Sequence, residues 1–98
     1  LSGGIDIAKA YAHIGNKAKA AEYTKAAFEN AHQYMIWYNS LKGGRFTQAQ
    51  QDCMMHIYVM SMCVDTAEMF DKALAKKLEA QLNADVSAFH AKGGVLPQ

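Results

Sequence analysis

Apolar residues at three- and four-residue spacing predict a short first helix. One of its faces carries Ile7, Ala10, Tyr11 and Ile14, as the spacing of an amphipathic helix requires. Gly15 should end the helix, because glycine adopts the left-handed conformation at a helix C-terminus at little cost. Ser2 or Asp6 is the expected N-cap, since either side chain offers an acceptor to the free N–H groups of the first turn.

A long second helix is predicted from Lys17 to about Leu41, with Asn16 as its N-cap. Its apolar residues form one stripe, which three large side chains widen. The stripe holds Ala20, Ala27, Ala31, Tyr34, Tyr38 and Leu41, and the widening residues are Phe28, Met35 and Trp37. A helix that is apolar over more than half of its circumference is usually packed on two sides, so this one should be an inner helix.

The loop Lys42-Gly43-Gly44-Arg45 separates this helix from a third one. Thr47 and Gln50 have the spacing of a capping box, in which each side chain bonds a backbone N–H near the helix start. Two neighbouring stripes then predict a helix that is buried on two sides. The first stripe is Cys53, Ile57, Met60, Val64 and Ala67, and the second is Met55, Val59, Met62 and Met69.

The helical pattern continues almost to His90, and about 45 residues without a break would be long for a globular helix. We therefore expect a break between Met69 and Lys72, with Asp71 as the next N-cap. The fourth helix should turn one set of residues inward and another to water, and Gly93-Gly94 should end it. The inward set is Leu74, Leu78, Leu82, Val86 and Phe89, and the outward set is Lys72, Lys76, Glu79 and Asn83.

Together these elements predict an all-α fold in one domain, residues 1–98. Its halves are two antiparallel helical hairpins, 5–41 and 47–91, because short loops place consecutive helices side by side in opposite directions. Composition agrees with this prediction. The single proline of the 98-residue chain is Pro97, and good helix formers such as Ala, Lys and Leu are abundant.

Charge and hydropathy exclude several classes of protein. The formal net charge is +1, so no basic excess points to nucleic acid. No apolar run approaches the roughly 20 residues that cross a bilayer, and we expect no membrane insertion of this segment. No signal-peptide pattern is present. The chain opens at Leu1 rather than at an initiator Met, which indicates a piece of a longer or processed protein.

Few residues of the chain suggest a disulfide, a metal site or a catalytic site. Cys53 and Cys63 would lie about 15 Å apart along one helix, too far for a disulfide, and should be buried thiols. Cys53 and His56 share a helix face, but a structural zinc site needs four ligands, and the histidines at 13, 32, 56 and 90 lack paired spacing. A Cys53–His56 nucleophile is disfavoured because a thiol within an apolar stripe is less acidic. We therefore expect no catalytic, cofactor or metal site.

The first hairpin resembles a tetratricopeptide repeat, in which small residues let two helices approach closely and large ones fill the gaps. The matching residues are Ile7, Ala8, Tyr11, Gly15, Ala20, Ala27 and Phe28. Three positions depart from the pattern: Gly4 and Thr24 stand where aromatic residues are usual, and His32 stands where a helix-ending proline is usual. The resemblance covers about a third of the chain and implies a repeat-like packing surface without naming a ligand.

A second resemblance covers more of the chain. Its features are the Tyr11-to-Gly15 hairpin, the run Trp37-Tyr38-Asn39-Ser40-Leu41, a loop, and a long helical region that ends near Phe89. They are similar to the soluble C-terminal region of a domain-of-unknown-function family of bacterial multispanning membrane proteins, distantly similar to protein O-mannosyltransferases. This resemblance implies a membrane-anchored parent protein with the present segment on its periplasmic side. The acidic catalytic residues of such transferases lie outside this chain.

Three functions follow as hypotheses. The first is a non-catalytic, repeat-like module that docks a protein partner, either another polypeptide or its own parent chain, with a homodimer as one form. The candidate interaction surface is Ala8, Tyr11, Ile14, Tyr34, Trp37 and Tyr38. The alternative is an accessory domain of a membrane glycosyltransferase-like protein. An independent small enzyme is the weakest hypothesis, because no general acid–base pair can be named.

Overall fold

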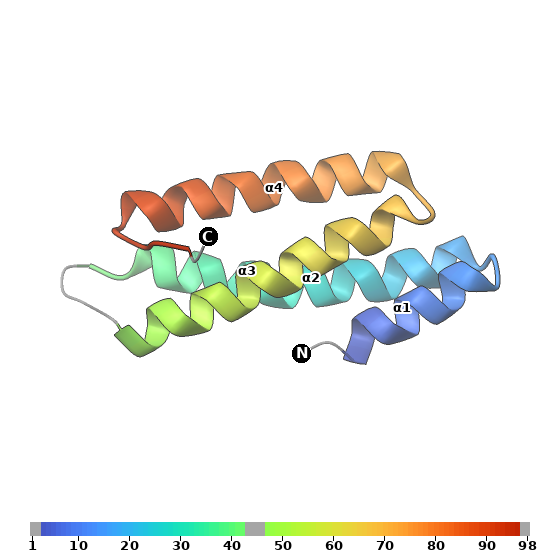
Figure 1. The fold of residues 1–98 in the computed structure, drawn as a ribbon, viewed down its shortest axis with the longest axis horizontal. Coiled ribbons are helices and arrows are strands. Elements are labelled where there is room, and N and C mark those ends of the chain that lie inside the picture. The colour runs from blue at the N-terminus through green and yellow to red at the C-terminus, as the bar shows by residue number, and fades with distance from the viewer. Residues whose placement is uncertain (1–2, 43–46, 97–98) are drawn as a thin grey trace.

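The computed structural model describes residues 3–42 and 47–96, and all regular structure in these ranges is α-helical. The helices are α1 (Gly3–His13), α2 (Lys17–Ser40), α3 (Thr47–Glu68) and α4 (Lys72–Ala91). They form an elongated body of 47 × 24 × 22 Å, in which the hairpins α1–α2 and α3–α4 pack on each other (Figure 1). The predicted all-α fold with two helical hairpins is confirmed.

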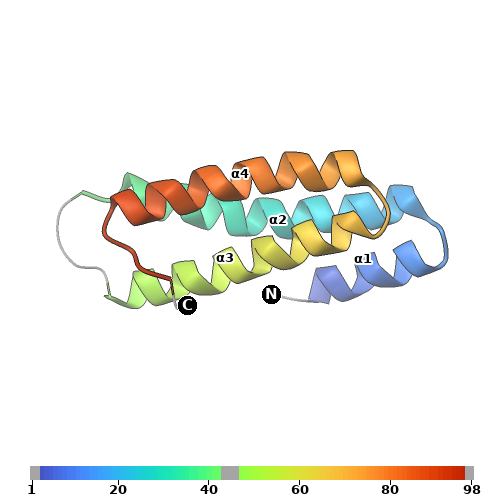
Figure 2. The same cartoon turned by 45° about the horizontal axis from the view of Figure 1, so that its top comes forward.

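The two long central helices organise the packing. Both α2 and α3 contact every other helix, whereas α1 and α4 do not touch each other. Figure 2 shows α4 and α1 on opposite sides of the α2–α3 pair. The prediction that α2 and α3 are inner helices is therefore confirmed.

The predicted helix boundaries largely hold. The Asn16 side chain accepts a hydrogen bond from the Lys19 N–H at 3.1 Å, and Asp71 accepts one from the Leu74 N–H at 3.0 Å, so both expected N-caps form. The break between α3 and α4 is also confirmed. Gly15 and Gly93 follow α1 and α4 with φ values of +80° and +95°, as a glycine-terminated helix requires.

Two details of the predicted caps differ from the structure. Asp6 lies inside the first turn of α1 rather than at its N-cap, because α1 already begins at Gly3, and Ser2 lies outside the described residues. Thr47 is itself the first helical residue of α3. Within the described ranges no side-chain hydrogen bond from Thr47 or Gln50 forms the predicted capping box. Of the predicted loop Lys42-Gly43-Gly44-Arg45, the last three residues fall outside the described residues.

The apolar face that the spacing indicated on α1 is not the face that the structure buries. Ile5 and Ala8 are buried, whereas Ile7 and Ile14 are 44% and 76% exposed, Ala10 is exposed and Tyr11 is half-buried. The reason is steric. A Cβ added to Gly4 would lie 3.8 Å from the Ala27 Cβ, so α1 approaches α2 through its small residues rather than through its largest apolar ones. Ile14 lies at the turn into α2, where no third helix covers it.

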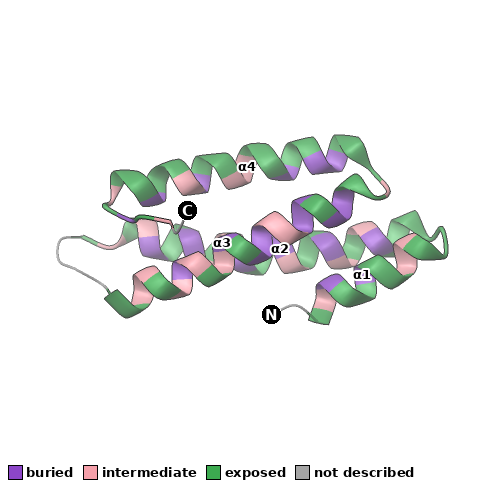
Figure 3. Ribbon diagram, viewed as in Figure 1, coloured by how far each residue is buried: buried purple, intermediate pink, exposed green. Residues whose placement is uncertain are grey.

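The core of the other helices follows the predicted stripes closely (Figure 3). All five residues of the first α3 stripe are buried, but in the second stripe Met55 and Met69 are 57% and 47% exposed. On α2 the half-exposed Trp37 lies outside the core. In α4, Leu82 and Val86 are half-buried, and the four predicted outward residues are exposed. The buried α2 residues are Ala20, Thr24, Phe28, Ala31, Met35 and Tyr38.

Two buried threonines provide a matched test of hydrogen bonding in this core. The Thr66 hydroxyl donates to the Met62 carbonyl oxygen at 2.8 Å, whereas the equally buried Thr24 hydroxyl has no partner within the described residues. An unsatisfied buried hydroxyl costs free energy, so we expect Thr24→Val to raise the free energy of unfolding by about 1 kcal/mol. Thr66→Val should be neutral or should lower it by up to about 1 kcal/mol. Urea denaturation of both variants measures the difference, and an equal effect of the two substitutions would contradict the expectation.

Candidate functional site

The six residues of the predicted interaction surface do not lie together. Ala8 and Tyr38 are buried in the core and offer no side-chain area to a partner. Tyr11 is half-buried and stacks on Tyr23, with ring centroids 5.8 Å apart. Ile14 is exposed at the turn between α1 and α2. Tyr34 and Trp37 lie in the second half of α2, away from that turn.

Tyr34 and Trp37 lie beyond the part of α2 that α1 covers. This helix has 11 residues and α2 has 24, and Gly4 of α1 lies opposite Ala27 of α2. The helical spacing places Asn30, Tyr34 and Trp37 on the same side of α2 as Ala27, one to three turns further along. The side of α2 that α1 covers therefore continues, uncovered, over these residues. In Figure 1 the N-terminal end of α1 lies well short of the α2 C-terminus.

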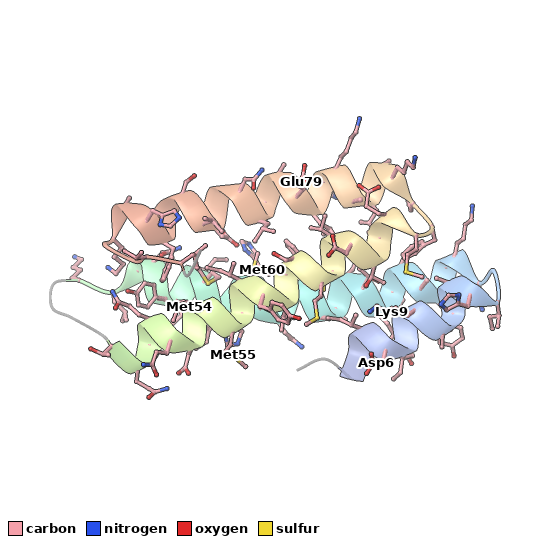
Figure 4. The ribbon with its side chains drawn as sticks, in the orientation of Figure 1. Asp6, Lys9, Met54, Met55, Met60 and Glu79 are labelled. Carbon is pink, nitrogen blue, oxygen red and sulfur yellow. The ribbon has the colours of Figure 1, made fainter. Side chains whose placement is uncertain are left out.

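An aromatic cluster fills this uncovered part of α2 and the adjoining turn of α3. The Tyr34 and His56 rings are parallel, with centroids 4.1 Å apart and an interplanar angle of 1°. Trp37 packs at a tilt against Tyr34, with centroids 5.3 Å apart, and is 49% exposed. Met55, the neighbour of His56, projects from α3 toward the edge along which α1 lies (Figure 4). We call Tyr34, Trp37, Met55 and His56 the aromatic surface.

Hydrogen bonds hold the aromatic surface in place. The Tyr34 hydroxyl donates to Asp52 Oδ2 at 3.3 Å, and Gln48 Nε2 donates to Asp52 Oδ1 at 3.1 Å. His56 Nδ1 donates to the backbone carbonyl of Asp52 at 2.6 Å, since a carbonyl oxygen only accepts. Burial, followed by the charge of Asp52 and its hydrogen bond, raises the pKa of Tyr34 to about 12. Tyr34 therefore stays a neutral donor at physiological pH, and the cluster is a rigid platform.

A second feature is a groove of about 720 Å³ between α2 and α4. The two helices run parallel and meet through their C-terminal halves. Tyr38 and Phe89 pack with ring centroids 5.7 Å apart, and Lys92 donates to the Leu41 carbonyl oxygen. The N-terminal halves lie further apart, and the groove runs between them. Its apolar floor includes Phe28, Leu74 and Leu78.

A buried polar cluster lies at the end of this groove. His32 Nδ1 and Asp85 Oδ2 are 2.5 Å apart, and Gln81 Nε2 donates to the other Asp85 oxygen at 3.1 Å. Both side chains of the His32–Asp85 pair are largely buried, with exposed fractions of 16% and 9%. This pair was missed at the sequence level, although the spacing Leu78-Leu82-Asp85-Phe89 places Asp85 on the apolar stripe of α4. A carboxylate at such a position requires a partner.

The two cysteines are buried and free. Burial raises the pKa of both thiols to about 12, and for Cys53 the charge of Asp52 adds to this effect. Across residues 3–42 and 47–96, no cluster of three or more Cys, His, Asp or Glu side chains is arranged to hold a metal ion. None of the helices in these ranges has the length and hydropathy to span a bilayer.

No protein-family model, no curated protein and no solved structure matches this chain. The resemblances to a tetratricopeptide repeat and to the membrane-protein tail therefore stay predictions.

The effect of Asp52 on the pKa of Tyr34 can be tested by titration. Asp52→Asn removes the negative charge that opposes ionisation of the phenol but leaves its burial unchanged. We expect the pKa of Tyr34 to fall from about 12 part of the way toward 10.0. NMR titration of the tyrosine Cζ resonances measures this shift. The control is Asp65→Asn, which removes an exposed carboxylate from the same helix. A Tyr34 pKa that responds equally to both substitutions would contradict the assignment.

Proposed function

We propose that this chain is a non-catalytic helical module that binds an amphipathic helix of a partner protein on the aromatic surface. The observation that carries the proposal is the side of α2 and α3 that continues uncovered beyond Gly4 of α1 and presents Trp37 and Met55. The partner helix would lie end to end with α1. It would contact Tyr34, Trp37, Met55 and His56.

The packing of α1 supports a helical occupant. This helix contacts both α2 and α3 and buries Ile5 and Ala8 against them. The aromatic surface continues that interface along the same two helices. A second helix in line with α1 would therefore meet the same backbone geometry, with an apolar stripe facing the aromatic side chains.

The composition of the aromatic surface also supports a binding role. Trp and Tyr are enriched among the residues that contribute most to protein–protein affinity. Here Tyr34 is held by Asp52 and His56, so little side-chain entropy would be lost when a partner binds. The exposed thioether of Met55 adapts to partner side chains of different shape. The Tyr34 hydroxyl bonds the Asp52 carboxylate, and His56 bonds the backbone carbonyl of Asp52. Such fixed hydrogen bonds suit a binding platform better than acid–base chemistry.

Selection from a displayed library of amphipathic helical peptides tests this function. Trp37 is the only tryptophan of the chain, so its emission reports directly on burial of the surface. We expect selected peptides to carry an apolar stripe and to shift the Trp37 emission to shorter wavelength. Trp37→Ala should weaken their binding at least tenfold, as expected for an interface hot spot.

Ile36→Ala is the matched control. Ile36 neighbours Trp37 in sequence and is similarly exposed, at 46%, but points to a different side of α2. This substitution should leave the affinity within about twofold. Peptides that bind Trp37→Ala as well as the parent protein would overturn the proposal. Concentration-dependent dimerisation abolished by Trp37→Ala would instead identify a second copy of the chain as the occupant, and would also overturn it.

A further inference from the structure

We propose that the groove between α2 and α4 binds an amphiphilic carboxylate, with its hydrocarbon chain on the apolar floor and its head group between Lys25 and Lys77. This site lies on the α4 side of α2, whereas the aromatic surface lies on the α1 side. The inference therefore stands independently of the proposed function.

The size and shape of the groove fit a small molecule. Its volume of about 720 Å³ falls within the range of roughly 300–1,000 Å³ typical of ligand pockets. Its α4 wall extends from Leu74 to Ala84, a rise of about 15 Å along the helix axis. Two parallel helices thus form a trough with an apolar floor, and a trough of this length suits a linear hydrocarbon chain better than a compact ring system.

The charges of the groove favour an anionic head group. Lys25 of α2 and Lys77 of α4 contribute to opposite walls. In the described part of the chain, neither ammonium group forms an ion pair with an acidic side chain. Among the described residues that line the groove, the one carboxylate belongs to Glu29, which accepts a hydrogen bond from Gln33 Nε2 at 2.7 Å. Two ammonium groups therefore face one exposed carboxylate, and a bound anion would balance them.

The polar cluster closes the far end of the groove without competing for that head group. Each oxygen of Asp85 already accepts a hydrogen bond, one from His32 Nδ1 and one from Gln81 Nε2. Because an ionised carboxylate only accepts, His32 carries a proton on Nδ1. The acidic charge at this end is thus paired and largely buried, so the hydrocarbon chain meets Phe28 and the paired cluster rather than a free carboxylate.

The experiment titrates the whole chain with decanoate, below its micelle concentration, and follows the backbone amide signals by NMR. The expected shifts lie at Phe28, Leu78 and Gln81 and leave Trp37 and Met55 unchanged. Lys25→Gln combined with Lys77→Gln should weaken binding at least tenfold. The matched control is Lys72→Gln with Lys76→Gln, which removes the same charge from exposed positions of α4 and should change the affinity less than twofold.

Two further measurements separate the roles of chain and head group. Ala80→Phe places a ring in the groove from an exposed position, so it should abolish the decanoate shifts while the protein stays folded. Decanol, which has a hydrocarbon chain of the same length and no charge, should bind at least tenfold more weakly than decanoate. Equal binding of decanol and decanoate, equal effects of the two lysine pairs, or shifts confined to the aromatic surface would each overturn the proposal.

Discussion

The packing of α2 against three other helices is the constraint on which the remaining structure depends. Its buried residues run from Ala20 to Tyr38 along almost the whole helix. Each of its neighbours covers a different side or a different length of it. Because α1 reaches only as far as Ala27, the side of α2 that faces α1 is closed near Ala27 and open near Trp37. The aromatic surface lies in this open part.

The attachment of α4 to α2 depends on a few specific contacts. Phe89 packs on Tyr38, Lys92 reaches the Leu41 carbonyl, and the His32–Asp85 pair joins the middle of the two helices. A buried hydrogen-bonded polar pair contributes little net stability because desolvation offsets the attraction, but removal of one partner leaves the other buried and unsatisfied. This pair therefore disfavours any other register of α4 on α2. By holding the C-terminal halves together, these contacts also define where the groove begins.

The layer formed by α2 and α3 separates the aromatic surface from the groove between α2 and α4. Since α1 and α4 do not touch, the α1 side of α2 and the α4 side are independent faces of one helix. Occupation of the aromatic surface would leave the groove open, and the reverse also holds. The same long helix would present one face to a partner helix and another to a small amphiphile, joined by a core that contains Met35 and Tyr38.

The sequence by itself determined the number of helices, several of their ends and most of their buried faces. These features depend on local physics: Gly15, Asn16, Asp71 and Gly93 act within one helical turn. The stripe from Cys53 to Ala67 is buried because its spacing places all of these apolar side chains on one face of the helix. In α1, by contrast, Ile5 and Ala8 are buried, because the close approach of Gly4 to Ala27 outweighed the hydrophobicity of Ile7 and Ile14.

Only the tertiary structure decided which polar and aromatic residues meet. The pairs His32–Asp85 and Tyr34–His56 lie far apart along the chain, and periodicity within one helix carries no information on the register between two. The sequence indicated that Tyr34, Trp37 and Tyr38 belong to one aromatic run. Tyr38 is buried, with its ring packed on Phe89 of α4, whereas Trp37 lies beyond the end of α1 and is half-exposed. The exposure of a residue thus depends on where its neighbouring helices lie.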